Sequence, residues 1–223
     1  MVKHTIDTVE YYTHLESPRV IFLSGMHGNE AESSELLTQW LTEHFATLDS
    51  FLFIPRVSPS AVGQGTRRNA QGNDINRQFV EGTTDQEVLQ VMKILKGQSA
   101  ILCLDVHEDP DRTQGFYIYD TGVMSKQELE TYREAIQKTP FKPYSGIDDI
   151  DDEHLQRMIE QGYVSLRPTD SEVSAGFGSV WMMKHHIVSR VFTMEVPGKA
   201  AKGDKAALIG TMIPFLLGAF GVS

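Results

Sequence analysis

Short apolar runs alternate with longer stretches of helical periodicity along the chain. A loosely alternating stretch predicts an edge strand at 5–14, and apolar runs bounded by turn residues predict buried strands at Val20–Leu23, Phe51–Val57, Ala100–Val106, Gly115–Tyr119 and Ser189–Val196. Helical spacing predicts helices over 31–47, 84–96, 125–138 and 204–219, and a shorter one near 151–161. Strands that alternate with helices indicate an α/β fold whose sheet is covered by helices on both faces.

Local signals support two of these helices. Gly97 follows the helix at 84–96, and glycine commonly occupies the first position beyond a helix. Ser125 and Glu128 have the spacing of a capping box at the start of the helix at 125–138. In contrast, the stretch 63–82 shows no periodicity, and aperiodic loops of this length in compact domains are often functional.

Length and composition narrow the class of protein. The chain has 223 residues, of which 40% are hydrophobic and 22% charged, so we expect one ordinary globular domain spanning 1–223. The net charge of −10 argues against a nucleic-acid partner, because phosphate binding needs a clustered basic surface. We interpret the acidic run Asp148–Glu153 as a solvated loop and helix start rather than a calcium site.

Neither end of the chain predicts a membrane partner. The segment Met1–Asp7 lacks the apolar stretch of a signal peptide, so we expect a cytoplasmic protein. The apolar run Ala206–Val222 contains Pro214 and falls short of the ~20 residues that span a bilayer, so we expect a buried terminal helix. The one cysteine, Cys103, lies in an apolar run, and no disulfide can form within the chain.

Candidate chemistry begins directly after the first buried strand. Gly25 and Gly28 predict a tight turn there, and His27 and Glu30 lie three residues apart before a helix starts. In open α/β sheets, ligands bind at the carboxyl ends of the strands. Imidazole nitrogen and carboxylate oxygen both suit zinc, although this pair alone is weak evidence for a metal.

A third candidate ligand, His107, follows the strand Ala100–Val106 at the corresponding position. Two imidazoles and one carboxylate form the ligand set of hydrolytic zinc sites that keep a fourth position open for water. A purely structural histidine among these charges would be costly to bury. The neighbouring Glu108 and Asp109 leave a second metal open, but we favour loop carboxylates that face solvent or a basic substrate side chain.

The loop Gly65–Phe79 is the most specific feature of the sequence. It holds three arginines, three asparagines and one aspartate, and Ile75 and Phe79 anchor it. Because arginine offers a fixed fork of donors that matches a carboxylate, this composition indicates an anion-binding loop. A metal beside a carboxylate clamp implies a substrate with a free carboxylate near the scissile bond.

Together these blocks resemble the zinc carboxypeptidase superfamily, which includes the aspartoacylase and succinylglutamate desuccinylase deacylases. The loop is similar to the peptidase pattern Gly-x-Arg-x-Asn-Ala-x-Gly-x-Asp-Leu-Asn-Arg-x-Phe, with Ile75 in the Leu place. The motifs cover about 20–120 and 189–198, whereas 139–180 matches nothing that we can place in the family pattern. The resemblance implies a single domain with a mixed central β-sheet, and a promoted-water hydrolase without a protein nucleophile.

For the metal centre, the resemblance implies one Zn²⁺ ion bound by His27, Glu30 and His107. It also implies that Asp74 accepts a hydrogen bond from the metal-bound His27, which would fix the orientation of that ring. Ser24 precedes Gly25 but lacks the context of a serine nucleophile.

For the substrate, the resemblance implies that Asn76 and Arg77 hold the terminal carboxylate and that Arg67 polarises the scissile carbonyl. Arg68 is adjacent and is an alternative to Arg67. Glu195 ends the last predicted strand, where a glutamate is more often a surface ion-pair partner. Beside a metal that acidifies water, a carboxylate becomes a general base, and the family places its catalytic glutamate on such a strand.

Three functions remain open at this stage. The first is a carboxypeptidase-like enzyme acting on a small peptide, including a cell-wall peptide, because Gly176–Trp181 resembles a segment of small bacterial members. The second is a deacylase of acyl-amino acids. Deacylases usually have fewer residues between the arginine and the asparagine that correspond to Arg67 and Asn76. The third is a non-catalytic module that binds zinc and carboxylates. Tyr144 and Tyr163 are candidates for the tyrosine that covers the substrate, and the sequence leaves the oligomeric state open.

Overall fold

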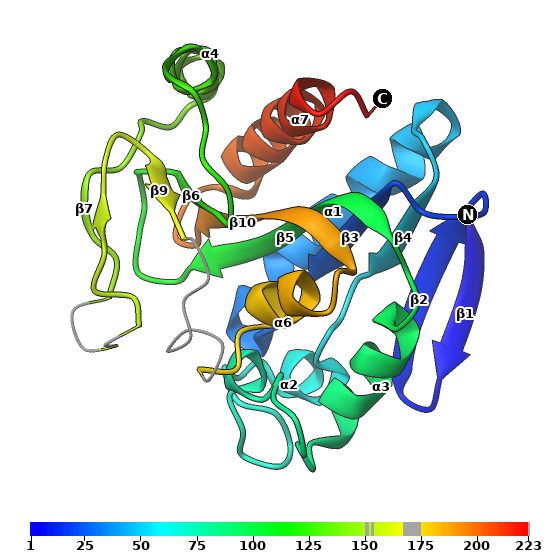
Figure 1. Cartoon of the computed structure of the whole chain (residues 1–223). Coiled ribbons are helices and arrows are strands. Elements are labelled where there is room, and N and C mark those ends of the chain that lie inside the picture. Colours follow the sequence, from blue (N-terminus) through cyan, green and yellow to red (C-terminus); the bar gives the residue numbers. More distant parts are fainter. Residues whose placement is uncertain (150–151, 153, 167–174, 223) are drawn as a thin grey trace.

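An eight-stranded mixed sheet runs through the protein (Figure 1). The computed structural model describes residues 1–149, 152, 154–166 and 175–222. The strands lie in the order β1 (Val2–Ile6), β2 (Val9–His14), β4 (Phe51–Ile54), β3 (Val20–Ser24), β5 (Ala100–Asp109), β10 (Val188–Pro197), β6 (Tyr117–Asp120) and β9 (Tyr163–Ser165). A separate two-stranded ribbon pairs β7 (Gly146–Ile147) with β8 (Met158–Ile159).

The four central strands are parallel, so their carboxyl ends meet at one edge of the sheet. In the order β4-β3-β5-β10, each strand pairs in parallel with the next. The register places Ser24 beside Val106, and His107 beside Glu195. Strand β6 then pairs antiparallel to β10, with Tyr117 beside Glu195. Polar residues from four distant segments therefore gather at this edge.

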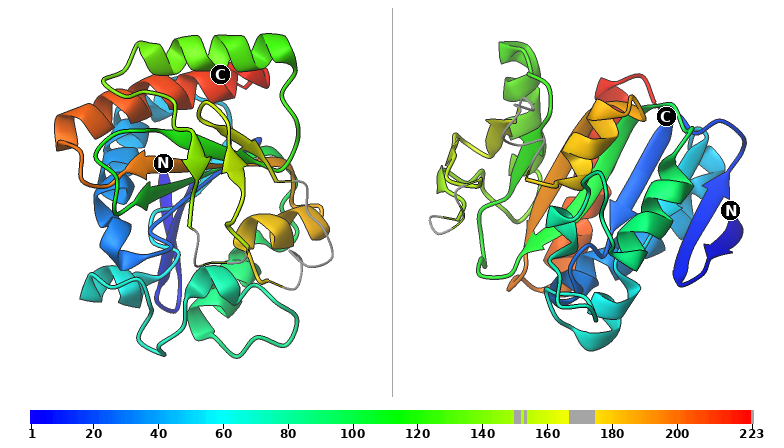
Figure 2. Two further views of the ribbon diagram at one scale, coloured as in Figure 1. Left: turned by 90° about the vertical axis from the view of Figure 1, so that its left-hand side faces the viewer. Right: turned by 60° about the horizontal axis from the view of Figure 1, so that its bottom comes forward.

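Helices cover both faces of the sheet. Apolar side chains of α1 (Ala31–His44), α4 (Lys126–Gln137) and α7 (Lys202–Ala219) pack with residues such as Phe22 and Leu104 on one face. Those of α3 (Gln86–Leu95) and α6 (Gly178–Lys184) pack with residues such as Ile21 and Cys103 on the other. The left view of Figure 2 shows α4 beside α7 above the sheet and α6 below it. Short helical segments complete the fold: α2 (Pro59–Gln64) and the 3-10 turns Gly28–Glu30, Phe45–Thr47 and Ile75–Arg77.

The predicted α/β fold, with a mixed sheet between two layers of helices, is confirmed. The capping box at Ser125 is present, Gly97 has a left-handed φ of 85°, and Cys103 is buried and free. The run predicted as a terminal helix is α7, and its apolar side chains lie in the core. Among the described residues, no helix has the length and apolar character needed to cross a bilayer.

Some predicted boundaries were wrong. The edge strand at 5–14 is a hairpin of β1 and β2, and β4 ends at Ile54 because Pro55 cannot donate to the ladder. The predicted helix near 151–161 is wrong where it is described, because Met158–Ile159 pairs with Gly146–Ile147. Its positions 151 and 153 lie outside the described residues. The sequence also missed α2, whose start is marked by Ser58 as the cap and Pro59 in the first turn.

Candidate metal centre and substrate cavity

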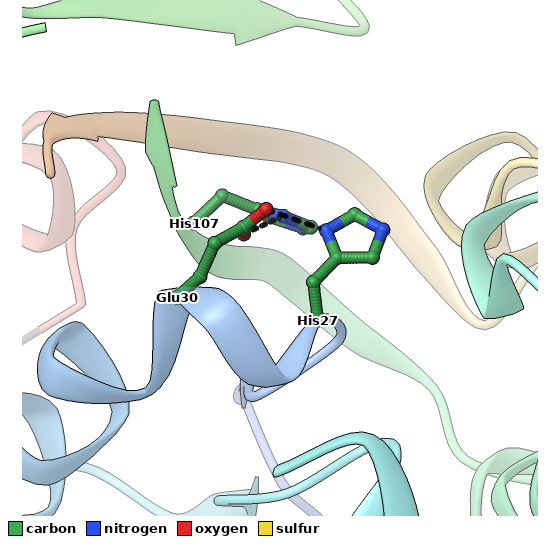
Figure 3. Close-up of side chains that lie close together, drawn as sticks. All are labelled: His27, Glu30 and His107. Carbon is green, nitrogen blue, oxygen red and sulfur yellow. Dashed lines mark hydrogen bonds and ion pairs between the residues drawn. The ribbon is translucent and has the colours of Figure 1, made fainter. Parts of the chain in front are cut away.

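His27, Glu30 and His107 converge on one point at the carboxyl edge of the sheet (Figure 3). Glu30 Oε1 lies 2.7 Å from His27 Nδ1, and Glu30 Oε2 lies 3.0 Å from His107 Nδ1. All three side chains are buried, and their ligand atoms lie within 4.8 Å of one another. The structure therefore brings together the two imidazoles and the carboxylate that the sequence singled out.

The turn that carries His27 is held by close backbone packing. Gly25 has a φ of 62°, a conformation that side-chain-bearing residues rarely adopt. At Gly28, a Cβ atom would lie 1.8 Å from the Ala61 carbonyl oxygen of α2. Gly28 N also donates to Thr66 O at 2.8 Å, next to the candidate Arg67. Both glycines therefore allow close packing against the turn that orients His27. The packing partners are α2 and the loop Gly65–Phe79, called the arginine loop below.

A carboxylate lies behind each imidazole on the side away from Glu30. Asp74 Oδ1 is 3.1 Å from His27 Nε2, the contact expected from the sequence. Asp105 Oδ2 is 3.2 Å from His107 Nε2, although the angle is outside the hydrogen-bond range, and Asp105 Oδ1 has no hydrogen-bond partner among the described residues. Carboxylates in this position fix the tautomer and orientation of metal-binding histidines. The sequence did not identify Asp105, whose only signal was its place two residues before His107 on the same strand face.

The electrostatics of the cluster suit a cation. Burial alone would raise the pKa of Glu30, but the charge of His27 and hydrogen bonds from both imidazoles hold this pKa well below its usual range. Burial would lower the pKa of His107, but Asp105 and Glu30 raise it well above its ordinary value. Two nitrogens and one carboxylate with acidic neighbours form a set that could hold a divalent ion, and this donor set fits zinc.

A buried ion pair between Lys205 and Glu108 lies next to the candidate metal ligands. Lys205 of α7 is 2% exposed, and its Nζ lies 2.7 Å from Glu108 Oε2 and 2.8 Å from Glu32 Oε2. Glu108 Oε1 accepts from Ser33 N at 2.5 Å, and Glu108 N donates to Glu30 Oε2 at 3.3 Å. Glu108 therefore ties the start of α1, which follows Glu30, to the strand that carries His107.

Glu108 and Asp109 are not solvent-facing loop carboxylates, as the sequence interpretation had it. Both are buried within β5. Glu108 pairs with Lys205, and Asp109 accepts from Arg112 Nε and from the Tyr117 hydroxyl. Within the described part of the chain, the one group of candidate metal ligands is the His27, Glu30 and His107 set, so the second-metal alternative gains no support.

Arg67, rather than Arg68, faces the cluster. Its Nη1 lies 3.7 Å from Glu30 Oε1, and its Nη2 lies 3.0 Å from Asp74 Oδ2. Arg68 instead donates to Gly72 O at 3.0 Å within its own loop. Arg67 is 43% exposed on its side chain, so it borders the cavity as a charge that a ligand can reach.

Asn76 and Arg77 lie together at the wall of the same cavity. Asn76 Oδ1 accepts from Gly178 N at 3.0 Å, and the NH₂ group of the same amide can only donate. Arg77 lies over the Phe177 ring at 4.2 Å, donates to Asn76 O, and lies 2.5 Å from Asp152 Oδ2 through Nη2. An internal carboxylate thus already contacts this guanidinium.

The last of the predicted site residues, Glu195, lies on β10. Its side chain is partly buried and lines the cavity beside His107. Burial raises the pKa of Glu195 well above its ordinary value; His107 opposes this shift, whereas Asp148, Glu30 and Asp109 add to it. A raised pKa is the property that a carboxylate needs to accept and return a proton near neutral pH.

One cavity of about 580 Å³ connects these residues. It is lined by His27, Glu30, Arg67, Asn76, Arg77, His107 and Glu195 among the residues that the sequence singled out. The acidic run is not simply solvated, because Asp148 also lines the cavity and Asp152 contacts Arg77. Neither Tyr144 nor Tyr163 is a lining residue, whereas Tyr117 and Tyr119, which the sequence missed, are. Ser24 is buried against Ser34 and Pro55 O.

This arrangement of strands is a zinc carboxypeptidase-like fold. A candidate metallopeptidase from Shewanella baltica superposes with a TM-score of 0.77 at 18% identity, over 99% of this chain and 86% of that one. A metallo-carboxypeptidase from Burkholderia cenocepacia gives 0.62 at 16%, over 94% and 59%. A succinylglutamate desuccinylase from Silicibacter gives 0.60 at 18%, over 96% and 61%. At these identities the likeness establishes the fold.

The family itself follows from the sequence match. The succinylglutamate desuccinylase/aspartoacylase catalytic domain model matches residues 16–133, more than half of the chain, and the chain belongs to that family. The matched range contains His27, Glu30 and His107 but ends before Glu195. No curated protein matches the chain. The names of the family and of these neighbours denote hydrolases.

We predict that the purified protein binds one zinc ion per chain and that His107→Ala abolishes this binding, because the substitution removes one of three buried ligands. Metal analysis after dialysis measures the stoichiometry. His185→Ala, which removes an exposed imidazole of the other helical layer, is the control and should retain the ion. Equal zinc content in the parent and His107→Ala would contradict the assignment.

We also predict that Lys205→Met lowers zinc affinity by roughly 10- to 100-fold, as loss of a group that orients ligands does. It leaves Glu108 buried without its cation, which should also cost about 3–5 kcal/mol of unfolding free energy. Lys202→Met removes a neighbouring but exposed pair with Glu35 at 3.0 Å and should change neither quantity. Lower stability with unchanged zinc affinity would limit Lys205 to a structural role.

Proposed function

We propose that this protein is a zinc-dependent hydrolase that cleaves an amide bond next to a free carboxylate, as a metallocarboxypeptidase does. One observation carries the proposal: a buried two-histidine, one-carboxylate cluster shares a single cavity with a general-base candidate, Glu195, and with Asn76 and Arg77. Family membership supports amide hydrolysis of small acylated or peptide substrates. The single catalytic domain is proposed to span 1–223.

A zinc ion held by His27, Glu30 and His107 would supply a Lewis acid and bring the pKa of a bound water toward ~7. The buried carboxylates of Asp74 and Asp105 would keep both rings oriented for that role. Arg67 borders the cavity 3.7 Å from Glu30, where its charge can stabilise the oxygen of the scissile carbonyl as negative charge develops.

Glu195 is proposed to move the proton. As a carboxylate beside His107, it accepts a proton from the attacking water, whose oxygen forms the new bond to the carbonyl carbon. The same group then gives the proton to the leaving nitrogen as the C–N bond breaks, which yields a free acid and an amine. The raised pKa of Glu195 suits both transfers.

Asn76 and Arg77 are proposed to hold the substrate carboxylate. The guanidinium is fixed over Phe177 and already contacts the Asp152 carboxylate, so its surroundings accommodate the same chemical group from a ligand. Bidentate donors of this kind orient a substrate and convert binding into positioning at the scissile bond.

A deacylase is the second candidate, because the matched family is that of succinylglutamate desuccinylase and aspartoacylase. The nine-residue step from Arg67 to Asn76 favours the peptidase, since it follows the peptidase pattern. Assays of a dipeptide series with free carboxyl ends against N-acetylaspartate and N-succinylglutamate separate the two. Hydrolysis of only the acyl-amino acids would replace the first proposal with the second.

We predict that Glu195→Gln lowers kcat by roughly 10²- to 10⁴-fold while substrate still binds, because the variant keeps the shape of the side chain but loses its proton acceptor. Steady-state rates and titration calorimetry on the zinc-loaded protein measure the two effects. A parent protein that binds peptides but hydrolyses none on a broad panel would instead indicate a zinc- and carboxylate-binding module.

We predict that Arg67→Ala lowers kcat/KM by roughly 100-fold, the effect of losing one donor to a developing oxyanion. Arg68→Ala is a matched control from the next position, because its side chain donates to Gly72 O within its own loop. Comparable losses in both variants would show that the loop as a whole, rather than the Arg67 charge, supports turnover.

A further inference from the structure

Several acidic side chains line the cavity, and Asp148 is one of them. Three of the others have cationic partners: Glu108 pairs with Lys205, Asp109 with Arg112, and Asp111 with Lys199 at 3.0 Å. Glu30 belongs to the candidate metal set. Asp148 differs from these, because in the described part of the chain no lysine, arginine or histidine forms an ion pair with its carboxylate.

Two neutral donors hold Asp148 in place. The Tyr117 hydroxyl contacts Oδ1, and the Tyr119 hydroxyl donates to Oδ2 at 2.7 Å. The same Tyr117 hydroxyl lies 3.1 Å from Asp109 Oδ2, so two carboxylates share one hydrogen. Burial and the charge of Asp109 raise the pKa of Asp148, whereas both hydroxyls and the charge of Arg112 act in the opposite direction. Arg112 Nη2 also donates to the Asp148 main-chain oxygen at 3.5 Å. A cation at this position would offset the cost of burial.

The register places Tyr117, whose hydroxyl contacts this carboxylate, across Glu195 from the metal cluster. His107, Glu195 and Tyr117 are directly opposed on the adjacent strands β5, β10 and β6. Two strand spacings separate His107 from Tyr117, which is roughly 10 Å. Thr193 and Tyr119, two positions along these strands, are also directly opposed and line the cavity. A side chain extending from a substrate at the metal cluster can therefore reach Asp148.

The carboxylate clamp lies within reach of the same residue. Asp148 and Asp152, which contacts Arg77, are four positions apart and can be separated by at most about 14 Å of extended chain. Arg77 and Asp148 also line the same cavity, so a substrate residue held there has the arginine and the aspartate on its walls.

We propose that Asp148 recognises a cationic side chain on the substrate residue whose carboxylate Asn76 and Arg77 hold. This inference rests on the proposed function and specifies its substrate class: peptides or acyl-amino acids that end in a residue with an ammonium or guanidinium group. The same charge disfavours a residue with an acidic side chain, such as aspartate or glutamate, by like-charge repulsion.

The test compares N-benzoylglycyl peptides that end in lysine, arginine, norleucine or glutamate, with zinc-loaded protein. Norleucine has the length of the lysine stem without its charge. We expect kcat/KM for lysine and arginine to exceed that for norleucine by roughly 10- to 100-fold, the factor carried by one hydrogen bond to a charged group. Asp148→Asn should reduce the lysine value to the norleucine value and leave the norleucine value close to that of the parent.

The matched control is Asp111→Asn. This aspartate also lines the cavity but is 90% exposed and pairs with Lys199, so its variant should keep the lysine-to-norleucine ratio. Equal rates for lysine and norleucine in the parent protein would overturn the proposal, and this comparison needs no folded variant. An equal loss on both substrates in Asp148→Asn would overturn it as well, because the residue would then act through Glu195 or the cavity shape.

Failure of the proposed function gives a different result. If no peptide is hydrolysed, titration calorimetry with Nα-acetyl-lysine and Nα-acetyl-norleucine still decides the role of Asp148. Tighter binding of the lysine compound, lost in Asp148→Asn, would support cation recognition without turnover. Equal binding of both compounds would overturn it.

Discussion

The Glu30 carboxylate between the His27 and His107 imidazoles is the interaction on which the rest of the structure depends. A buried carboxylate costs several kcal/mol unless charged or donating groups surround it, so the turn after β3 and the end of β5 must stay together. Asp74 and Asp105 hold the far sides of the two rings. Glu108 of β5 pairs with Lys205 and accepts from the main chain at the start of α1, so these elements stay together.

The parallel strands turn this local cluster into an arranged site. The carboxyl ends of β3, β5 and β10 coincide, so His27, His107 and Glu195 lie at one edge although they are distant in sequence. The antiparallel strand β6 extends that edge with Tyr117 and Tyr119. The proposed chemistry is therefore distributed across the sheet: carbonyl and carboxylate binding from the arginine loop, proton transfer from β10, and side-chain selection from β6.

The sequence predicted those features that depend on residues close together along the chain. The cluster at His27 and Glu30, the arginine loop and the strand before His107 are short motifs, and the apolar runs predicted the central strands. Lys205 and Tyr117 could not be found this way, because their roles come from strand register and from helix packing over about one hundred residues of chain. The helix predicted near 151–161 failed because local composition gave no sign of the pairing between β7 and β8.

The most direct test of the metal centre is the X-ray absorption spectrum of the zinc-loaded protein at the zinc edge. The account predicts two imidazole nitrogens at about 2.0–2.1 Å and oxygen ligands at about 2.0–2.2 Å, with no sulfur. A spectrum with one imidazole or none, or with a sulfur ligand from Cys103, would contradict the convergence of His27, Glu30 and His107 on one ion.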